Sequence, residues 1–489
     1  MAAPDRWRAL ALLACTQFVL ILDTSIINVA APSIGRDLGI SPAALSWVAN
    51  AYLVSFGGLL LLSGRAADLL GRRRLFIAGL GTLAAASLLG ALVDSAPLLI
   101  TARVVQGTGA AMAAAAALAL LLSLFDDGPE RHRALGIFAA TAGAGGAAGT
   151  VLGGALTSWL GWESTFALNV VVGIGLILPA RRLLPAGNRS GNAGGFDLPG
   201  ALSVTGGLAL LAYAVLDAGE SGWRDPDPVT LLTGSLAIGL LTAFVLVERR
   251  VRHPLVPPAL FRRRTLRLAN VLAGMWQMAL FPMFFLVSLY LQSVLGHEPV
   301  TSGLGLLPLS VVVVLVASGT DRLIGRFGLR AVMCTGFVLV AVGLVWQSTL
   351  SPSGSFVADV LPPSLLLGVA LPLVSVTTAV AATLGTERDG TGLASGLVNT
   401  SQQFGSVIGL ALLSGVAAAR TSAVPGPRDV ALTEGFSAAF LAGAALALVA
   451  ALLTLRLVVP VAPAAVTTRS TDRIPADPAV NAERQTSYE

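Results

Sequence analysis

The sequence predicts an all-α polytopic membrane protein with 14 transmembrane helices, and three observations lead to this prediction. First, 55% of the 489 residues are hydrophobic and only 12% are charged, whereas a soluble chain carries about a quarter charged residues. Second, the apolar residues form blocks of about 20 residues, long enough to span a bilayer as a helix. Third, most charges lie between these blocks. A cytosolic enzyme, a disordered chain and a nucleic-acid-binding protein are thereby excluded, and the lipid bilayer is the expected environment.

Each block is expected to be helical because backbone groups inside lipid must be hydrogen-bonded within their own segment. The first block is interpreted as an uncleaved span, because it lacks a small-residue cleavage site and Asp23 interrupts it. The pair 197–218 and 229–247 is the least sharply defined. In chain order, the expected spans cover residues 8–31, 46–63, 75–94, 97–124, 134–158, 164–184, 197–218, 229–247, 268–294, 301–320, 329–350, 358–383, 392–419 and 435–459.

The spans divide the chain into four expected parts. Residues 1–190 form a six-helix bundle, residues 191–250 hold two extra transmembrane helices, and residues 251–460 form a second six-helix bundle. Residues 461–489 are rich in Pro, Ala, Thr and mixed charges, which predicts a disordered cytoplasmic tail.

Arginine predicts the orientation of the chain. All 31 basic residues are arginine. With the N-terminus inside, the external loops hold only Arg36, Arg224, Arg420 and Arg428, Arg103 falls within a span, and the other 26 lie on the cytoplasmic side. Such asymmetry follows the positive-inside rule, and an even number of spans places both termini in the cytoplasm.

The chain offers no residues for a metal site, a disulfide framework or a nucleotide site. Cys15 and Cys334 lie in separate apolar blocks, and the three histidines form no cluster. A phosphate-binding Gly-x-x-x-x-Gly-Lys-Ser/Thr loop requires a lysine, and the chain has none. We therefore expect no cofactor and no direct use of ATP.

The loop between the second and third spans carries a spaced set of glycine, aspartate and arginine, GRAADLLGRRR. Gly64 would let a helix end approach a neighbour, and Gly71 allows a tight turn. Asp68 suits the positive end of a helix or an arginine partner. Alternatively, Arg72, Arg73 and Arg74 serve only as topology anchors.

Two charged residues interrupt expected spans. Arg103 lies in the fourth span, where an arginine is costly and predicts a function; the alternative is that it reaches out to the nearby outer surface. Asp23, in the first span, is the only acidic residue well inside any span. A carboxyl group balanced between desolvation and a nearby cation can exchange a proton near neutral pH. At about 1.5 Å per residue, the two side chains are expected at similar depths, although the sequence does not show which faces meet. A structural hydrogen-bond anchor is the alternative role for Asp23.

The fifth span is rich in glycine. Gly145, Gly149, Gly153 and Gly154 recur at or near four-residue spacing, which allows close helix packing in lipid. A purely structural role is therefore a strong alternative to a role in transport.

These four motifs resemble those of the major facilitator superfamily, and most closely its fourteen-span drug:proton antiporter branch of methylenomycin-resistance-type and multidrug exporters. The resemblance covers nearly the whole chain and implies the major facilitator fold, with two six-helix bundles plus two additional central spans. It also implies a conformational latch at the loop motif and proton coupling at Asp23 and Arg103. Ser25 and Thr150 depart from the branch pattern, which has threonine and proline there. The missing proline weakens the link to antiport.

A substrate cavity is expected at the middle of the membrane, between the two halves. The ninth span carries soft, polarizable side chains suited to a permissive apolar pocket, although a lipid-facing helix would show the same residues. The candidate cavity residues are Asn28, Gln106, Trp276, Gln277, Met278, Phe281, Asn399 and Gln403.

The expected function is export of hydrophobic or amphiphilic small molecules, including antibiotics, driven by proton influx through alternating access. The expected location is the bacterial cytoplasmic membrane, as a multi-pass monomer with no enzymatic activity. A dedicated exporter or a symporter of one endogenous metabolite is the nearest alternative. A channel-like or scaffolding protein is a more distant alternative, because it would have no reason to carry Asp23, Arg103 and the loop motif.

Overall fold

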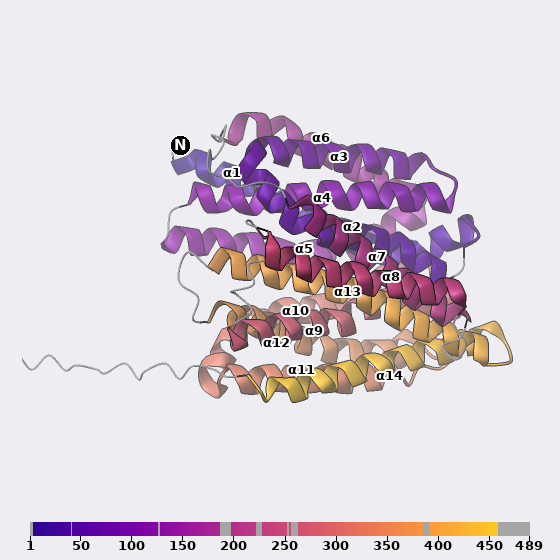
Figure 1. Ribbon diagram of the computed structural model, residues 1–489. Coiled ribbons are helices and arrows are strands. Elements are labelled where there is room, and N and C mark those ends of the chain that lie inside the picture. The colour runs from indigo at the N-terminus through magenta and orange to yellow at the C-terminus, as the bar shows by residue number, and fades with distance from the viewer. Residues whose placement is uncertain are drawn as a thin grey trace, which may run out of the picture.

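The computed structural model describes residues 3–40, 42–125, 128–185, 197–221, 227–251, 254–255, 263–384 and 391–457. Within these ranges the chain is helical, and 14 helices are long and apolar enough to cross a membrane. Figure 1 shows them side by side in one elongated body. The predicted fold class and number of spans are confirmed. The predicted tail, residues 461–489, lies outside the described ranges.

The first half of the chain forms six helices. They are α1 (Ala3–Asp37), α2 (Pro42–Leu70), α3 (Arg72–Leu92), α4 (Ala96–Leu124), α5 (Pro129–Leu160) and α6 (Glu163–Leu183). Several are longer than the expected spans, because helical hydrogen bonding continues past the apolar block. Gly71 ends α2 with a φ of +99°, a conformation that favours glycine, so α3 can begin at the next residue.

The second half also contributes six helices, two of them joined to short π-helical turns. They are α9 (Arg264–Leu289) with η2 (Tyr290–Val294), α10 (Pro299–Phe327), α11 (Leu329–Gln347), η3 (Phe356–Val360) with α12 (Leu361–Thr383), α13 (Thr391–Ala423) and α14 (Arg428–Thr454). The two additional helices, α7 (Leu198–Ser221) and α8 (Pro228–Arg250), lie between the halves in sequence.

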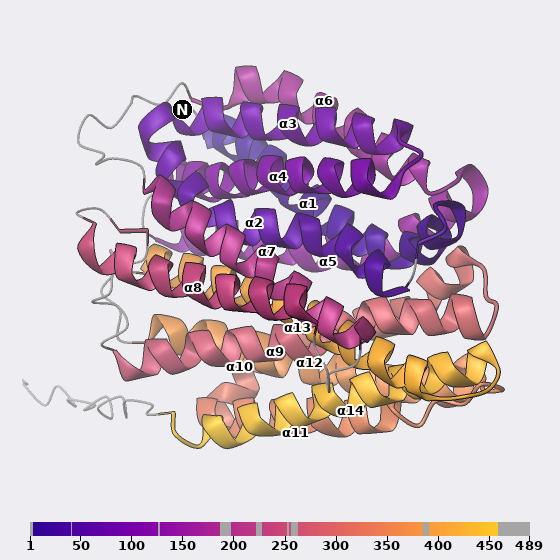
Figure 2. The ribbon, with the colours of Figure 1, turned by 45° about the vertical axis from the view of Figure 1, so that its right-hand side comes forward.

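The helices pack as two bundles that meet along two flanks. In the first bundle α1 packs on α5, and α4 packs on both α2 and α3; in the second, α9 packs on α13, and α12 packs on both α10 and α11. The bundles meet where α5 packs on α10 and α2 packs on α13. Helix α7 packs on both α2 and α13, and α8 covers α7 (Figure 2).

One end of the molecule carries Arg72–Arg74 and the arginines that end α6 and α8; we call it the arginine-rich end. At the opposite end α5 and α10 touch. A Cβ atom on Gly154 would lie 2.6 Å from the Pro299 carbonyl oxygen, and the Val300 amide donates to the Ser158 hydroxyl over 3.0 Å. Nearer the arginine-rich end, the α5 residue Gly143 is exposed and has no atom within 4 Å of its Cβ position. The contact between α5 and α10 therefore loosens toward the arginine-rich end.

Candidate functional site

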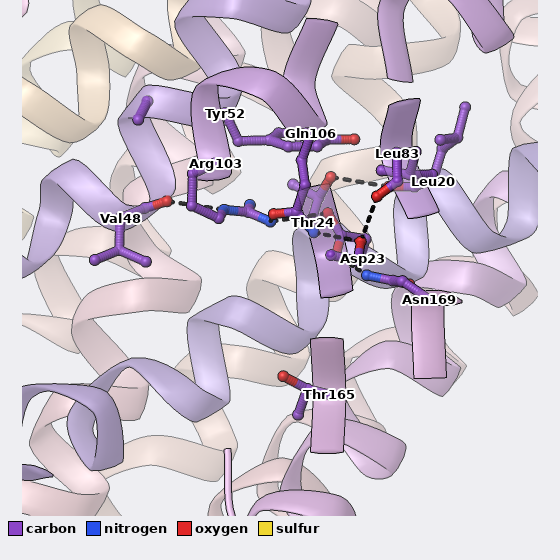
Figure 3. A network of polar contacts seen from close by, with 12 residues as sticks. Leu20, Asp23, Thr24, Val48, Tyr52, Leu83, Arg103, Gln106, Thr165 and Asn169 are labelled. Carbon is purple, nitrogen blue, oxygen red and sulfur yellow. Dashed lines mark hydrogen bonds and ion pairs between the residues drawn. The ribbon is translucent and has the colours of Figure 1, made fainter. Parts of the chain in front are cut away.

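A buried ion pair lies inside the first bundle. The Arg103 guanidinium on α4 donates from Nη1 to Asp23 Oδ2 on α1 over 3.0 Å. Arg103 is 1% exposed and Asp23 is 4% exposed. Figure 3 shows the two side chains pointing toward one another. The structure thus excludes the alternative in which Arg103 reaches the outer surface, and it brings together the two residues expected at similar depths.

Arg103 is held by further acceptors. Its Nε donates to the Val48 carbonyl on α2 over 3.0 Å, and Nη1 also donates to Gln106 Oε1 over 3.0 Å. Gln106 in turn donates from Nε2 to the Ser87 hydroxyl on α3 over 2.6 Å. A buried charge is costly unless it is paired and hydrogen-bonded, and these bonds meet most of that requirement for the guanidinium.

Asp23 has a second partner that the sequence did not assign. The Asn169 amide on α6 donates from Nδ2 to Asp23 Oδ1, so both carboxylate oxygens accept a hydrogen bond. Asn169 is 1% exposed. With Asn169 included, the network around the ion pair joins α1, α2, α3, α4 and α6 (Figure 3).

Tyr52 covers the ion pair from α2. Its ring centroid lies 4.4 Å from Arg103 Cζ, within the range of a cation–π contact. The same ring stacks on Phe56, with centroids 5.8 Å apart and planes at 7°. No sequence signal marks this residue, because an aromatic side chain in an apolar span is ordinary.

A cavity of about 330 Å³ lies between the two bundles. Five of the predicted cavity residues lie in its wall: Asn28, Trp276, Gln277, Phe281 and Gln403. Further wall residues come from α1, α2, α5, α9, α10 and α12, and include Thr24, Tyr52, Phe56, Gly143, Thr150, Phe284 and Leu371. The wall residues are apolar, aromatic or uncharged polar, so the cavity suits an uncharged or weakly polar ligand.

Three predicted cavity residues lie elsewhere. Gln106 is fully buried in the Arg103 network, Asn399 is exposed, and Met278 is half-buried and absent from the cavity wall. The Met278 backbone lies against α13, because a Cβ atom on Gly409 would meet it at 2.6 Å. These three predictions are corrected: helix rotation, which the sequence does not show, turns these side chains away from the cavity.

The loop motif forms contacts inside the first bundle. Arg72 donates from Nη2 to Asp68 Oδ1 over 3.2 Å and from Nη1 to the Ala119 carbonyl on α4 over 3.2 Å. Arg73 donates to the Leu184 carbonyl, just after α6, over 3.1 Å. Both arginines therefore bind the ends of neighbouring helices, in addition to any role in orienting the chain in the membrane. The close approach expected at Gly64 is absent, since no described atom lies within 4 Å of its Cβ position.

The glycines of α5 lie at helix contacts. Gly145 and Gly149 face the α1 backbone, where a Cβ atom would lie 2.5 Å from the Phe18 carbonyl oxygen and 2.8 Å from the Leu22 carbonyl oxygen, respectively. Gly153 also faces α1, at Ile26, while Gly154 faces α10. The motif thus lets α5 pack closely on α1 along its length and on the second bundle at the end opposite the arginine-rich end.

Comparison with known proteins agrees with this architecture. The chain is 40% identical over 460 residues to the cephamycin export protein CmcT of Amycolatopsis lactamdurans, covering 92% of each chain. It is 38% identical to the puromycin resistance protein pur8 of Streptomyces alboniger, covering 86% of this chain and 83% of that one. The tetracenomycin C resistance and export protein of Streptomyces glaucescens is 31% identical, over 88% of this chain and 81% of that one.

Solved structures share the fold at low sequence identity. A bacterial homologue of the human lysosomal transporter Spinster, in an inward-facing and unoccupied conformation, superposes with a TM-score of 0.68 at 14% identity, covering 94% of this chain and 98% of that one. The POT family transporter PepTSo gives a TM-score of 0.67 at 16% identity, covering 92% of this chain and 97% of that one. The sequence profile of the Major Facilitator Superfamily matches residues 13–410. This chain therefore belongs to the Major Facilitator Superfamily.

Proposed function

We propose that the protein exports hydrophobic or amphiphilic small molecules, antibiotics among them, in exchange for protons. The observation that carries this proposal is a buried carboxylate–guanidinium pair, Asp23 with Arg103, placed beside an apolar cavity between two bundles. Four relatives whose names state export of, or resistance to, cephamycin, puromycin, tetracenomycin C or lincomycin support the substrate class.

The cavity supports substrates that bind mainly through apolar contact and a few hydrogen bonds. Its wall offers aromatic faces from Tyr52, Trp276, Phe281 and Phe284, together with carboxamides such as Gln403. Such a wall binds by apolar contact and a few hydrogen bonds, which tolerates varied shapes. No acidic or basic side chain is among its described lining residues.

Asp23 is the group proposed to carry the proton. As a carboxylate it accepts from Arg103 and Asn169. Protonation would remove the charge that pairs with Arg103 and would favour a different arrangement of α1 against α4. Transport by alternating access requires that the proton and the substrate favour different conformations, because only differential affinity can couple two ligands.

The orientation is proposed from arginine. The arginine-rich end would face the cytoplasm, so the molecule would be closed toward the outside and both chain termini would lie inside. The protein would act as a monomer in the bacterial cytoplasmic membrane, and the proton gradient would supply its only driving force.

The test is accumulation of puromycin in inverted membrane vesicles, with and without an imposed pH gradient. The wild-type protein is expected to accumulate puromycin only with the gradient. Asp23→Asn resembles the protonated form, so this variant should still exchange puromycin downhill but should not accumulate it. The matched control is Asp429→Asn, an exposed carboxylate at the start of α14, which should behave as wild type.

Accumulation by Asp23→Asn at the wild-type level would show that another group carries the proton and that Asp23 is a structural anchor. Repeating the assay with cephamycin C, lincomycin and tetracenomycin C distinguishes a multidrug exporter from a transporter dedicated to one metabolite. Gradient-driven transport of several of these compounds supports a multidrug exporter, whereas transport of none of the four would favour a dedicated metabolite transporter.

A further inference from the structure

Tyr52 is the one described side chain that both lines the central cavity and contacts the guanidinium of the buried ion pair. It is 1% exposed and belongs to the cavity wall, and its ring lies 4.4 Å from Arg103 Cζ. Neither Asp23 nor Arg103 belongs to that wall. In Figure 3 the Tyr52 side chain lies alongside Arg103 and Gln106.

Tyr52 is also fixed at both ends. Its ring stacks in parallel on Phe56, one helical turn further along α2, and its hydroxyl interacts with the Thr24 side chain. Thr24 follows Asp23 on α1 and lines the cavity, while its hydroxyl donates to the Leu20 carbonyl over 3.0 Å. Tyr52 and Thr24 together form the wall that stands between the cavity and the ion pair.

We propose that Tyr52 is a positioning residue that keeps cavity water away from the Asp23–Arg103 pair and transmits substrate occupancy to it. A substrate that packs against the Tyr52 and Phe56 rings holds the phenol over Arg103 and keeps the pair closed. When the cavity is empty, the ring can move aside transiently, which opens a path to Asp23, and its return over Arg103 closes the path again. The inference rests on the proposed proton exchange and names the residue through which the cavity acts on it.

The residues around Asp23 favour Tyr52 as the group that couples the cavity to the ion pair. The charged and titratable groups that face Asp23 are Arg103 from α4 and Tyr52 from α2. Helix α6 contributes Asn169, which is uncharged, and α5 packs on α1 through glycines. Among the described residues, the Tyr52 ring is therefore the cavity-lining group in direct contact with the Arg103 guanidinium.

The first experiment measures proton leak without any substrate. Purified protein in liposomes containing a pH-sensitive dye is given an inward proton gradient. Tyr52→Leu removes the ring, so its leak is expected to exceed that of the wild-type protein. The expected rise in the leak is about fivefold to thirtyfold. Loss of a desolvated cation–π contact shifts the equilibrium between the closed and open path by this factor. Tyr52→Phe keeps the ring and should remain as tight as wild type.

The matched control is Phe284→Leu. Phe284 lines the same cavity from α9, and no described ring contact joins it to Tyr52 or Arg103. This variant should weaken puromycin binding without raising the leak. The double variant Tyr52→Leu/Asp23→Asn should lose the leak of Tyr52→Leu, because the path would end at a group that no longer takes a proton.

The second experiment measures the pH dependence of puromycin binding to the same proteins in lipid nanodiscs. Wild-type, Tyr52→Phe and Phe284→Leu proteins should share one pH profile, whereas the profile of Tyr52→Leu should be flat. If Tyr52→Leu is poorly folded, Tyr52→Met fills similar space without a ring and is used instead. A tight Tyr52→Leu or Tyr52→Met protein with a wild-type pH profile would overturn the inference. Failure of the wild-type protein to use the gradient would instead overturn the proposed function, so the two failures are distinguishable.

Discussion

Arg103 connects three helices through one side chain, with acceptors at Asp23 on α1, Val48 on α2 and Gln106 on its own helix. The guanidinium is suited to this because its donors point in several fixed directions, whereas lysine offers a single compact ammonium group. A buried pair of this kind contributes little net stability compared with an apolar pair. Its retention here is therefore better explained by function than by folding.

Removing one partner of the pair should cost more stability than removing both charges. Arg103→Gln leaves the Asp23 carboxylate buried without a cation, so we expect a loss of about 3–5 kcal/mol in the free energy of unfolding. The double variant Arg103→Gln/Asp23→Asn should recover part of that loss, since neither charge remains. Denaturant unfolding in mixed micelles checks both values. A loss in the double variant equal to the sum of the losses in Arg103→Gln and in Asp23→Asn would mean that the two side chains are not coupled.

Single residues show where prediction from sequence stops. Asp23 and Arg103 stand out because a charge inside an apolar block is rare. Tyr52 and Asn169 do not stand out, because nothing along the chain says that α2 and α6 turn these side chains toward the pair. The same missing information on helix rotation explains why Gln106, Met278 and Asn399 do not line the cavity although five other candidates do.

At the scale of helices, glycine sets how closely two backbones approach. On α5, Gly154 leaves room for the Pro299 backbone, and a larger side chain would have to push α10 away because a backbone atom cannot move aside as a flexible side chain can. The spacing of these glycines was visible in the sequence, but their partners were not. The contacts divide them between α1 and α10, which assigns Gly154 to the interface between the bundles.

Gly154→Val should therefore open the contact between α5 and α10 at the end opposite the arginine-rich end. Overpacking of this kind costs about 1–3 kcal/mol, enough to shift the balance between conformations. Spin labels at Trp159 and Leu304, both exposed on these helices, report the separation in a background that carries Cys15→Ser and Cys334→Ser. The distance should increase by several ångströms. Gly136→Val, on the same helix with open space around it, should leave the distance unchanged; an unchanged distance in both would contradict the assignment.

The junction between α2 and α3 gives a second prediction for an element. Asp68, in the last turn of α2, holds Arg72 at the start of α3, and Arg72 also binds the end of α4. The family resemblance implies that this motif stabilises the outward-facing state. Asp68→Asn should therefore insert normally, export less puromycin and spend more time open to the cytoplasm. Maleimide labelling of a Gly143→Cys variant should then become faster. Asp94→Asn, an exposed carboxylate between α3 and α4, serves as the control. Full export with unchanged labelling would refute the latch.

For the whole molecule, the number of spans followed from the sequence because block length and apolar composition are properties of each segment alone. The ends of the helices followed less well: α1 and α5 extend beyond their apolar blocks at both ends, where hydrogen bonding rather than hydropathy decides. The meeting of α5 with α10 and of α2 with α13 depends on contacts between distant segments, which a single sequence does not show.

The orientation of the whole chain can be tested with reporter fusions. A reporter fused after residue 225 should be extracytoplasmic, whereas reporters fused after residues 190 and 255 should be cytoplasmic, because the outer connections carry few arginines. Alkaline phosphatase and green fluorescent protein fusions give opposite signals on the two sides. Finding all three positions on one side would mean that α7 and α8 do not cross the membrane.

Helix α7 makes the interface between the bundles mechanically unequal on its two flanks. Helix α7 packs on both α2 and α13 and so holds together the flank that these two helices form. The bundles cannot separate there without breaking the contact of α7 with α2 or with α13. On the flank formed by α5 and α10, α1 packs on α5 but only slightly on α10, so among the described residues no helix there packs firmly on both. The bundles would then separate mainly at the flank formed by α5 and α10, and the flank held by α7 would act as the hinge. Lipid-soluble molecules dissolved in the leaflet beside this flank would then enter the cavity laterally, between α5 and α10.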